Sequence, residues 1–308
     1  ILVLEPSKSQ WQRFPLVIAS AKALGACDVG AFKVTVPAEL QYPLLPEEKT
    51  TKRWCWGYRA KALNKAYRVE MSQTRQVLGR TSSTYSASTD EAFEQHEKLL
   101  SEDGLGGVFY RTDIPVETPN QRATNHLPPK SIIWPLEGNR LSMTKYSVPG
   151  LHWPYGYESG SKFGASFSDH VEHFGLFSIS HLHEGRKVWR IIPPSAADAF
   201  VEKLKESDHE ITWDCDQCVR HAGVFVPVST LKEWRIPHTI IDQRASEIII
   251  TMPGAYHSGF STGYTLAEAV NYADEDWRLD AHDVCRPPSC PDYIPTEVLA
   301  LLGSGEEQ

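Results

Sequence analysis

Short apolar segments recur along the second half of the chain. From Val108 onward, runs rich in β-branched and aromatic residues are separated by Pro and Gly, and they read GVFYRTDI, SIIWPL, LFSISHLH, KVWRIIPP, EIIITMPG and TLAEAVNYA. Such spacing is typical of an all-β sandwich or barrel core. The stretch SAADAFVEKLKES has apolar residues at helical spacing and predicts a helix inserted into this core. The tail PTEVLALLGSG predicts a final short helix.

The first third of the chain has a more mixed pattern. A helical stretch is predicted around Trp11 to Leu24, and a strand follows in which the apolar residues alternate, at Phe32, Val34 and Val36. Residues 46–87 are polar and rich in Lys, Arg, Ser and Thr, which predicts a linker or a mobile insert. Residues 88–91, with the letters STDE, have the form of a capping box. They predict a short helix with one apolar side, formed by Phe93, His96 and Leu100.

Composition and charge narrow the class of partner. The chain has 308 residues, 41% of them hydrophobic, which is enough for one large core or two moderate ones. Its formal net charge of −8 argues against strong nucleic-acid binding by this chain alone and favours a basic peptide as the partner. No apolar run approaches the roughly 18 residues needed to cross a bilayer, so we expect a soluble protein that does not enter membranes.

Two histidines and a glutamate are candidates for a metal centre. His170 and Glu172 are two residues apart, so in a strand their side chains leave the same face. His257 follows 85 residues later, just past the apolar run EIIITMPG. Two histidines and one carboxylate form the facial triad that suits non-haem Fe(II), because three coordination positions stay open for co-substrate and O2. Other histidines that could compete as ligands, but that we assign to supporting roles, are His173, His181 and His183.

The sequence around these candidates resembles the JmjC histone lysine demethylases. The run HVEHFGLFSISHLHEGRKVWRIIPP is similar to a family run with His-x-Glu or His-x-Asp, a SINYLH-like strand, a Lys and a Trp. The run MPGAYHSGFSTGYTLAEAVNYADEDW resembles the family's distal-histidine segment, and VFYRTDI resembles its YGAD-type segment. Residues 1–42 resemble the JmjN segment of one demethylase branch. The resemblance implies a mainly β fold with helical additions, a double-stranded β-helix of the jelly-roll or cupin-like type.

The resemblance also implies a binding site for 2-oxoglutarate. Lys187 and Tyr110 match the residues that hold the far carboxylate of this co-substrate. Phe167 matches the aromatic wall beside it, and Trp189 belongs to the same group of cofactor-binding residues. Ser180 stands where many family members carry Asn. Serine still offers a hydrogen-bond donor, its hydroxyl, but its shorter side chain reaches less far.

For the methylated lysine itself, the resemblance implies a small set of contacts. Tyr155 and Tyr157, in the string PYGYE, are similar to aromatic residues that line the family's substrate channel. Asn271 matches a polar residue beside the methyl groups. Aromatic faces and oxygen contacts suit a methylammonium cation.

Four of the six cysteines fall as two close pairs, which suggests a metal site more than a disulfide. JmjN-containing demethylases have a structural zinc site, and the resemblance implies that its ligands here are Cys215, His221, Cys285 and Cys290. Cys218 is then a spare thiol or an alternative to His221. The competing interpretation is that these are unlinked loop cysteines.

The expected organisation has five parts. These are a JmjN-like segment at 1–45, a polar linker or insert at 46–87, a helix and mixed linker at 88–125, a JmjC catalytic core at 126–277 and a zinc-stapled helical element at 278–308.

The function implied by the resemblance is demethylation of a methylated histone H3 tail through N-methyl hydroxylation. O2 and 2-oxoglutarate are consumed, formaldehyde, succinate and CO2 are released, and the location is nuclear. Two alternatives remain: a non-enzymatic chromatin-binding scaffold, and a hydroxylase of a protein side chain.

Overall fold

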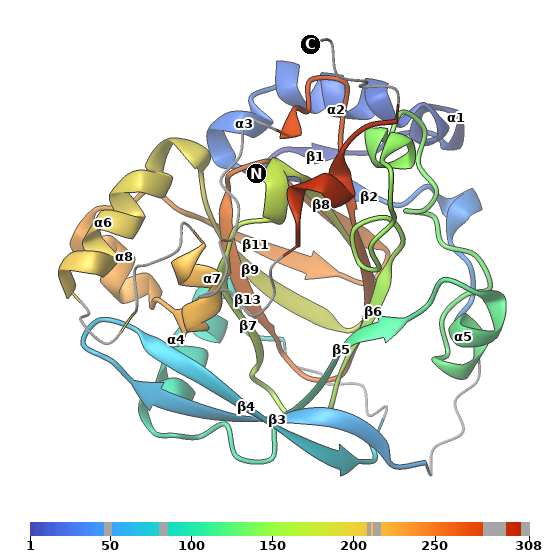
Figure 1. Ribbon diagram of the computed structural model, residues 1–308. Coiled ribbons are helices and arrows are strands. Elements are labelled where there is room, and N and C mark those ends of the chain that lie inside the picture. Colours follow the sequence, from blue (N-terminus) through green and yellow to red (C-terminus); the bar gives the residue numbers. More distant parts are fainter. Residues whose placement is uncertain (46–50, 80–85, 208–210, 212–216, 280–293, 303–308) are drawn as a thin grey trace.

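Two β-sheets face each other (Figure 1). Side chains from both sheets line a central cavity. The structure is a computed structural model that describes residues 1–45, 51–79, 86–207, 211, 217–279 and 294–302. The larger sheet has ten strands in the order β1-β2-β12-β8-β14-β6-β5-β3-β4-β10, and the smaller has four in the order β11-β9-β13-β7. Most neighbouring strands are antiparallel. This arrangement confirms the predicted mainly β core and is consistent with a cupin-like jelly roll.

The strands of the larger sheet vary more in length than those of the smaller sheet. Those of the larger sheet are β1 (Val3–Leu4), β2 (Ala31–Thr35), β3 (Arg53–Ala62), β4 (Tyr67–Gln76), β5 (Phe109–Pro115), β6 (Tyr155–Ser159), β8 (Phe177–Glu184), β10 (Val224–Phe225), β12 (Glu247–Thr251) and β14 (Thr265–Tyr272). Those of the smaller sheet are β7 (Ala165–His170), β9 (Arg186–Ile192), β11 (Thr239–Arg244) and β13 (Tyr256–Ser261).

The helices lie around the sheets. They are α1 (Lys8–Gln12), α2 (Phe14–Ala23), α3 (Ala26–Val29), α4 (Thr89–Ser101), α5 (Pro119–Thr124), α6 (Ala197–Ser207), α7 (Cys218–Ala222) and α8 (Val228–Trp234). Short 3-10 turns occur at Ala38–Leu40, Arg140–Met143, His173–Gly175, Pro194–Ala196 and Thr296–Leu299. Within the described ranges, no helix is both long and apolar enough to span a membrane.

The N-terminal segment packs on the outer face of the larger sheet. The single helix predicted around Trp11 to Leu24 is instead two helices, because Pro15 near the start of α2 begins a new helix after Arg13. Phe14 is fully buried, and its ring meets those of Trp11 and Tyr272 edge to face at 5.1 and 4.8 Å. The predicted strand is β2, which pairs with β12. The segment is thereby built into the main sheet.

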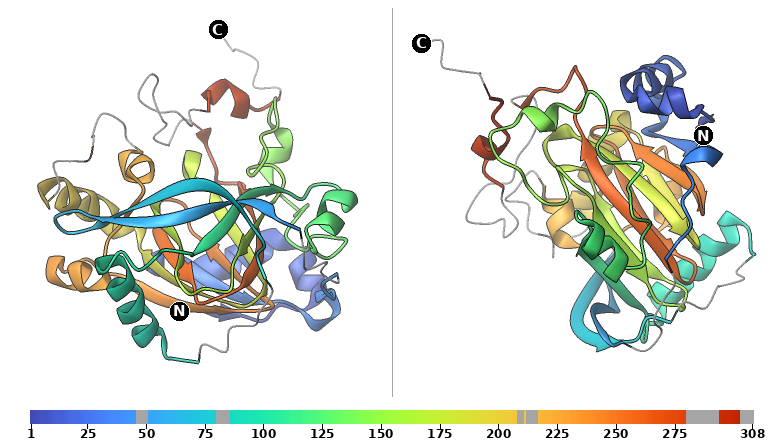
Figure 2. Two further views of the ribbon diagram at one scale, coloured as in Figure 1. Left: turned by 90° about the horizontal axis from the view of Figure 1, so that it is seen from below. Right: turned by 90° about the vertical axis from the view of Figure 1, so that its right-hand side faces the viewer.

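The prediction of a linker over 46–87 is wrong for most of that segment. β3 and β4 form a hairpin that is paired without interruption from Arg53 and Gln76 to Ala62 and Tyr67. In the left view of Figure 2 this light-blue hairpin runs across the molecule. Its inward-facing side chains enter a buried cluster, whereas its many charged residues lie on the exposed side. A two-stranded ribbon with one solvated face needs few apolar residues, so its amino-acid composition is similar to that of a linker.

The prediction of a strand over SIIWPL is also wrong. Residues 131–136 are irregular, and Ile133 is buried beneath α1, where Trp11 Nε1 donates a hydrogen bond to the carbonyl of Ile132 at 2.9 Å. Pro135 has no backbone N–H and therefore cannot donate a hydrogen bond to a strand ladder.

Two helix predictions are confirmed. The insert over SAADAFVEKLKES is α6, which packs through Phe200 and Leu204 onto the cluster beneath it. The capping box is present at the start of α4, where Ser88 Oγ accepts from the backbone N–H of Glu91 and the Glu91 carboxylate accepts from that of Ser88. The predicted C-terminal helix is only a 3-10 turn over Thr296–Leu299.

Candidate active site

A cavity of about 640 Å³ lies between the two sheets and collects most of the predicted site residues. It is open enough to admit a peptide side chain together with a small co-substrate. The predicted residues in its wall are Tyr110, Tyr157, Phe167, His170, Glu172, Ser180, Lys187, Trp189, His221 and His257.

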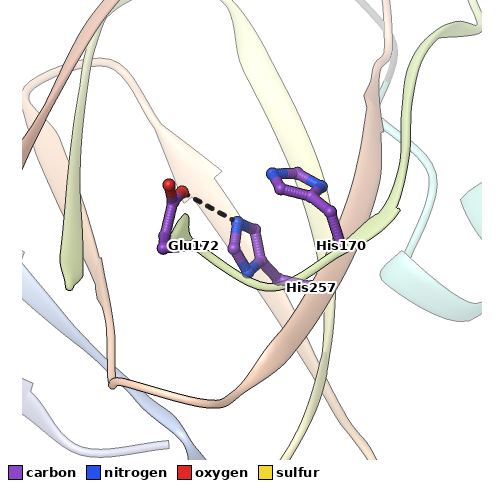
Figure 3. A group of neighbouring side chains, drawn as sticks. All are labelled: His170, Glu172 and His257. Atoms are coloured by element: carbon purple, nitrogen blue, oxygen red, sulfur yellow. Dashed lines mark ion pairs between the residues drawn. The ribbon is translucent and has the colours of Figure 1, made fainter. Parts of the chain in front are cut away.

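His170, Glu172 and His257 converge at one side of this cavity (Figure 3). The two histidines lie on the neighbouring strands β7 and β13, directly opposite each other in the register, and their rings are 4.1 Å apart. β7 ends at His170, so Glu172 follows the strand rather than sharing it, contrary to expectation. The carboxylate still reaches the centre, since Glu172 Oε1 lies 3.4 Å from His257 Nε2.

Hydrogen bonds and charges prepare the triad for a cation. Nδ1 of His170 lies 2.7 Å from the carbonyl of Ser168, which fixes the ring and leaves Nε2 for a metal. Burial, with His257 and Arg220 nearby, lowers the pKa of His170 to about 3, so this imidazole is neutral. Burial alone would raise the pKa of Glu172, but the hydrogen bond from His257, with the charge of Arg220 nearby, holds it well below its ordinary value. A neutral imidazole beside a carboxylate is the donor chemistry that a divalent ion requires.

Asn271 supports the triad from the larger sheet. Its Nδ2 donates to Glu172 Oε2 at 3.0 Å and to the carbonyl of Phe177 at 3.0 Å. The amide therefore orients the carboxylate of Glu172, which lies outside any strand. The sequence resemblance placed Asn271 beside the substrate, and it missed this contact with a residue 99 positions away.

The other end of the cavity holds a buried lysine. Lys187 is 4% exposed, and its Nζ donates to the Tyr110 hydroxyl at 3.2 Å. No acidic side chain in the described part of the chain forms an ion pair with Lys187, and burial lowers its pKa to about 7. A buried cation of this kind suits an anionic ligand, because such a ligand supplies the missing charge.

Aromatic and small residues shape the space between these ends. The Phe167 and Trp189 rings meet at 4.7 Å, and Trp189 Nε1 donates to Gln243 Oε1 at 2.8 Å, which fixes the indole. Ser180 lies on β8 in the cavity wall, and its carbonyl accepts from Gln243 Nε2 at 2.9 Å. Gln243 was not found from the sequence, because nothing in its neighbourhood marks it.

The predicted substrate residues do not all line the cavity. Tyr157 does, with its ring 6.4 Å from that of Tyr110, whereas Tyr155 is not among the lining residues. Sequence reasoning missed two others. Tyr58 enters from the β3–β4 hairpin and donates to the carbonyl of Ser166 at 2.7 Å. Arg220 enters from α7 and donates to the carbonyl of Val171 at 3.1 Å.

The predicted zinc ligands are only partly within the described residues. His221 lies on α7 in the cavity wall, and Cys218 is buried at the start of the same helix. The others, Cys215, Cys285 and Cys290, lie outside the described residues. The zinc site stays a prediction.

A jelly-roll-like core with two histidines and a glutamate converging in its central cavity is consistent with the cupin-like class, and these three side chains could hold a metal ion. Residues 159–272 match the family described as "JmjC domain, hydroxylase". Over this range the chain is similar to a JmjC domain, as the sequence predicted. The matched range includes the whole triad and Lys187.

Two curated relatives are lysine demethylases by name. Over 144 residues, which are 46% of this chain, it is 35% identical to lysine-specific demethylase 4D of Rattus norvegicus and 32% identical to probable lysine-specific demethylase 4F of Homo sapiens. The matched region spans 28% and 22% of the length of those relatives, so less than a third of each is represented.

Proposed function

We propose that this chain is an Fe(II)- and 2-oxoglutarate-dependent oxygenase that removes methyl groups from a methylated lysine. The observation that carries the proposal is one cavity with a metal-type triad at one side and the buried Lys187 at the other. Between them is room for a short dicarboxylate. The names of the demethylase relatives support lysine as the substrate residue.

In this proposal His170, Glu172 and His257 hold the iron. Bound iron and 2-oxoglutarate together supply the oxidising power that inserts one oxygen atom of O2 into a substrate C–H bond. The chain's own residues set the geometry. Ser168 orients His170 through its carbonyl, and Asn271 orients Glu172.

The co-substrate is bound by the far end of the cavity. Lys187 pairs with the distal carboxylate, and the Tyr110 hydroxyl donates to the same group. Phe167 and Trp189 form an apolar wall that limits water around the reacting atoms, and Ser180 offers a hydroxyl beside them.

The methylated lysine enters beside the hairpin. Tyr157 in the wall, together with Tyr155 and Asn271, is the proposed contact set for the methylammonium group. Hydroxylation of an N-methyl group gives an N-hydroxymethyl lysine, which loses formaldehyde and leaves one methyl group fewer. The other products are succinate and CO2.

The proposal also includes the substrate, the cellular location, the N-terminal segment and a structural zinc site. The substrate is a histone H3 tail, consistent with an acidic chain that accepts a basic peptide, and the location is nuclear. Residues 1–45 act as a JmjN segment, and a structural zinc is held by Cys215, His221, Cys285 and Cys290, with Cys218 as the alternative to His221.

Product formation tests the proposal. The protein is incubated with Fe(II), ascorbate, 2-oxoglutarate and a trimethyl-lysine peptide, and succinate and formaldehyde are measured together. Equal amounts of both products, absent with Glu172→Ala, are expected. Succinate without formaldehyde, with a peptide that gains one oxygen atom, would instead identify a side-chain hydroxylase. Neither product, from a protein that does not bind 2-oxoglutarate, would identify a scaffold.

A further inference from the structure

A second cluster of metal-binding side chains lies on the opposite face of the larger sheet. His181 and His183 alternate along β8 with Ser180, whose side chain lines the central cavity, so the histidines point away from it. Glu268 on β14 is paired with His181 in the register and points to the same face. His181 and Glu268 are buried, as is the His183 ring.

The three side chains are spaced as ligands of one ion. Their ligand atoms all lie within 4.8 Å of one another, as do those of the iron-type triad. Glu268 Oε1 is 3.0 Å from His183 Nε2 and 3.9 Å from His181 Nδ1. The two imidazole rings are 4.1 Å apart, the same separation as between His170 and His257.

One ring nitrogen of His181 lies beside this cluster without a hydrogen bond in the described part of the chain. Its buried Nδ1 has no hydrogen-bond partner among the described residues, because 3.9 Å to Glu268 is too long for a hydrogen bond.

A small cavity adjoins both histidines. Its volume is about 30 Å³, and its wall is completed by Leu40, Gln41, Tyr42, Leu44, Pro128, Lys130, Ile132 and Ser246. That is room for roughly one or two waters, and therefore for an ion with a water as a further ligand.

Arg122 fixes the carboxylate of the cluster. It donates to both oxygens of Glu268, at 2.7 and 3.2 Å, and to the carbonyls of Pro128 and Val116. Outer partners that orient a carboxylate in this way are usual around metal sites. They leave Glu268 Oε1 facing both histidines.

We propose that His181, His183 and Glu268 form a second binding site for a divalent transition-metal ion, separate from the iron-type centre. Two imidazoles and one carboxylate suit zinc, with water as the fourth ligand. The ion would join β8, which carries Ser180 into the cavity wall, to β14, which carries the Asn271 amide that contacts Glu172. The competing possibility is a metal-free network in which Arg122 alone balances Glu268.

Metal stoichiometry tests this site independently of catalysis. The whole chain carrying His170→Ala and His257→Ala, which remove the first centre, is incubated with excess zinc and desalted, and bound zinc is measured by inductively coupled plasma mass spectrometry. Adding His181→Gln should remove one zinc per chain. The matched control, His238→Gln, changes a half-buried histidine outside both clusters and should remove none. Equal zinc content with and without His181→Gln would overturn the proposal.

A second measurement needs no buried substitution and decides the matter if His181→Gln does not fold. Crystals of the unaltered chain are soaked in zinc, and anomalous scattering is recorded at the zinc edge. A peak about 2.0–2.2 Å from the nearest ligand atoms of His181, His183 and Glu268 is expected. A peak at the first centre and none at the second would overturn the proposal. Neither result depends on turnover of 2-oxoglutarate.

Discussion

Replacement of Lys187 by Met is the most informative change to the proposed co-substrate pocket. The lysine is buried, and its Nζ lies 5.6 to 5.8 Å from the ring centres of Tyr110, Tyr157 and Phe167. Methionine has nearly the same length and packs against the same rings, but it carries no charge. The substitution therefore isolates the electrostatic contribution of Lys187 to binding of 2-oxoglutarate.

The size of the effect follows from the charged hydrogen bond that the substitution removes. A hydrogen bond to a charged group contributes about 1.5–3 kcal/mol. At about 1.4 kcal/mol per tenfold change, Lys187→Met should weaken 2-oxoglutarate binding by about 10- to 150-fold. The control Lys145→Met removes an exposed lysine near Tyr146 and should leave the affinity unchanged.

The same lysine predicts a pH dependence. Burial lowers the pKa of Lys187 from 10.5 to about 7, so between these pH values the unfolded chain binds more protons at this group than the folded chain. Its contribution to stability therefore rises with pH across that window. A dicarboxylate favours the charged form, so binding at about pH 8 should take up a proton, and affinity should fall as the pH rises above 7.

Isothermal titration calorimetry measures both effects. The iron-loaded protein is titrated with 2-oxoglutarate without oxygen, at about pH 8, in buffers with different heats of ionisation. The wild type should take up a proton on binding, and Lys187→Met should not. Equal affinity and equal proton uptake in the two proteins would refute the assignment of Lys187 to the carboxylate.

Three further changes test other contacts. Asn271→Leu should weaken iron binding by about 10- to 100-fold in a metal titration, and unchanged affinity would show that the amide does not position Glu172. Phe14→Ala should lower the free energy of unfolding by about 3–5 kcal/mol in urea, whereas a loss below about 1 kcal/mol would contradict its place in the core. Gly185→Ala should lower the melting temperature, because a Cβ there would overlap the Tyr264 carbonyl oxygen at a φ of +86°; Gly106→Ala, with nothing within 4 Å, is the control.

Local pattern was enough to predict the β core and the helix α4. The Ser88 capping box involves only four consecutive residues, so a short stretch of sequence is enough to predict it. The spacing of His170 and Glu172 also identified candidate ligands, although β7 ends at His170 and leaves Glu172 outside the strand. The β3–β4 hairpin was missed because its exposed face is charged and only its inner face is apolar.

Contacts between distant segments could not be read from the chain. Asn271 meets Glu172 only because β14 and β8 adopt one register, and a shift of one residue would turn the amide to the other face. The same register places Glu268 beside His181. Arg220 reaches the cavity from a short helix whose place depends on packing rather than on its own sequence.

Mass spectrometry of methylated histone H3 peptides tests the central claim most directly. A panel of such peptides is incubated with the protein, Fe(II), ascorbate and 2-oxoglutarate, with Glu172→Ala as the control. We predict stepwise loss of methyl groups from a peptide with the wild type and none with the variant. No change in any peptide, despite measurable binding of 2-oxoglutarate, would contradict demethylation of histone H3.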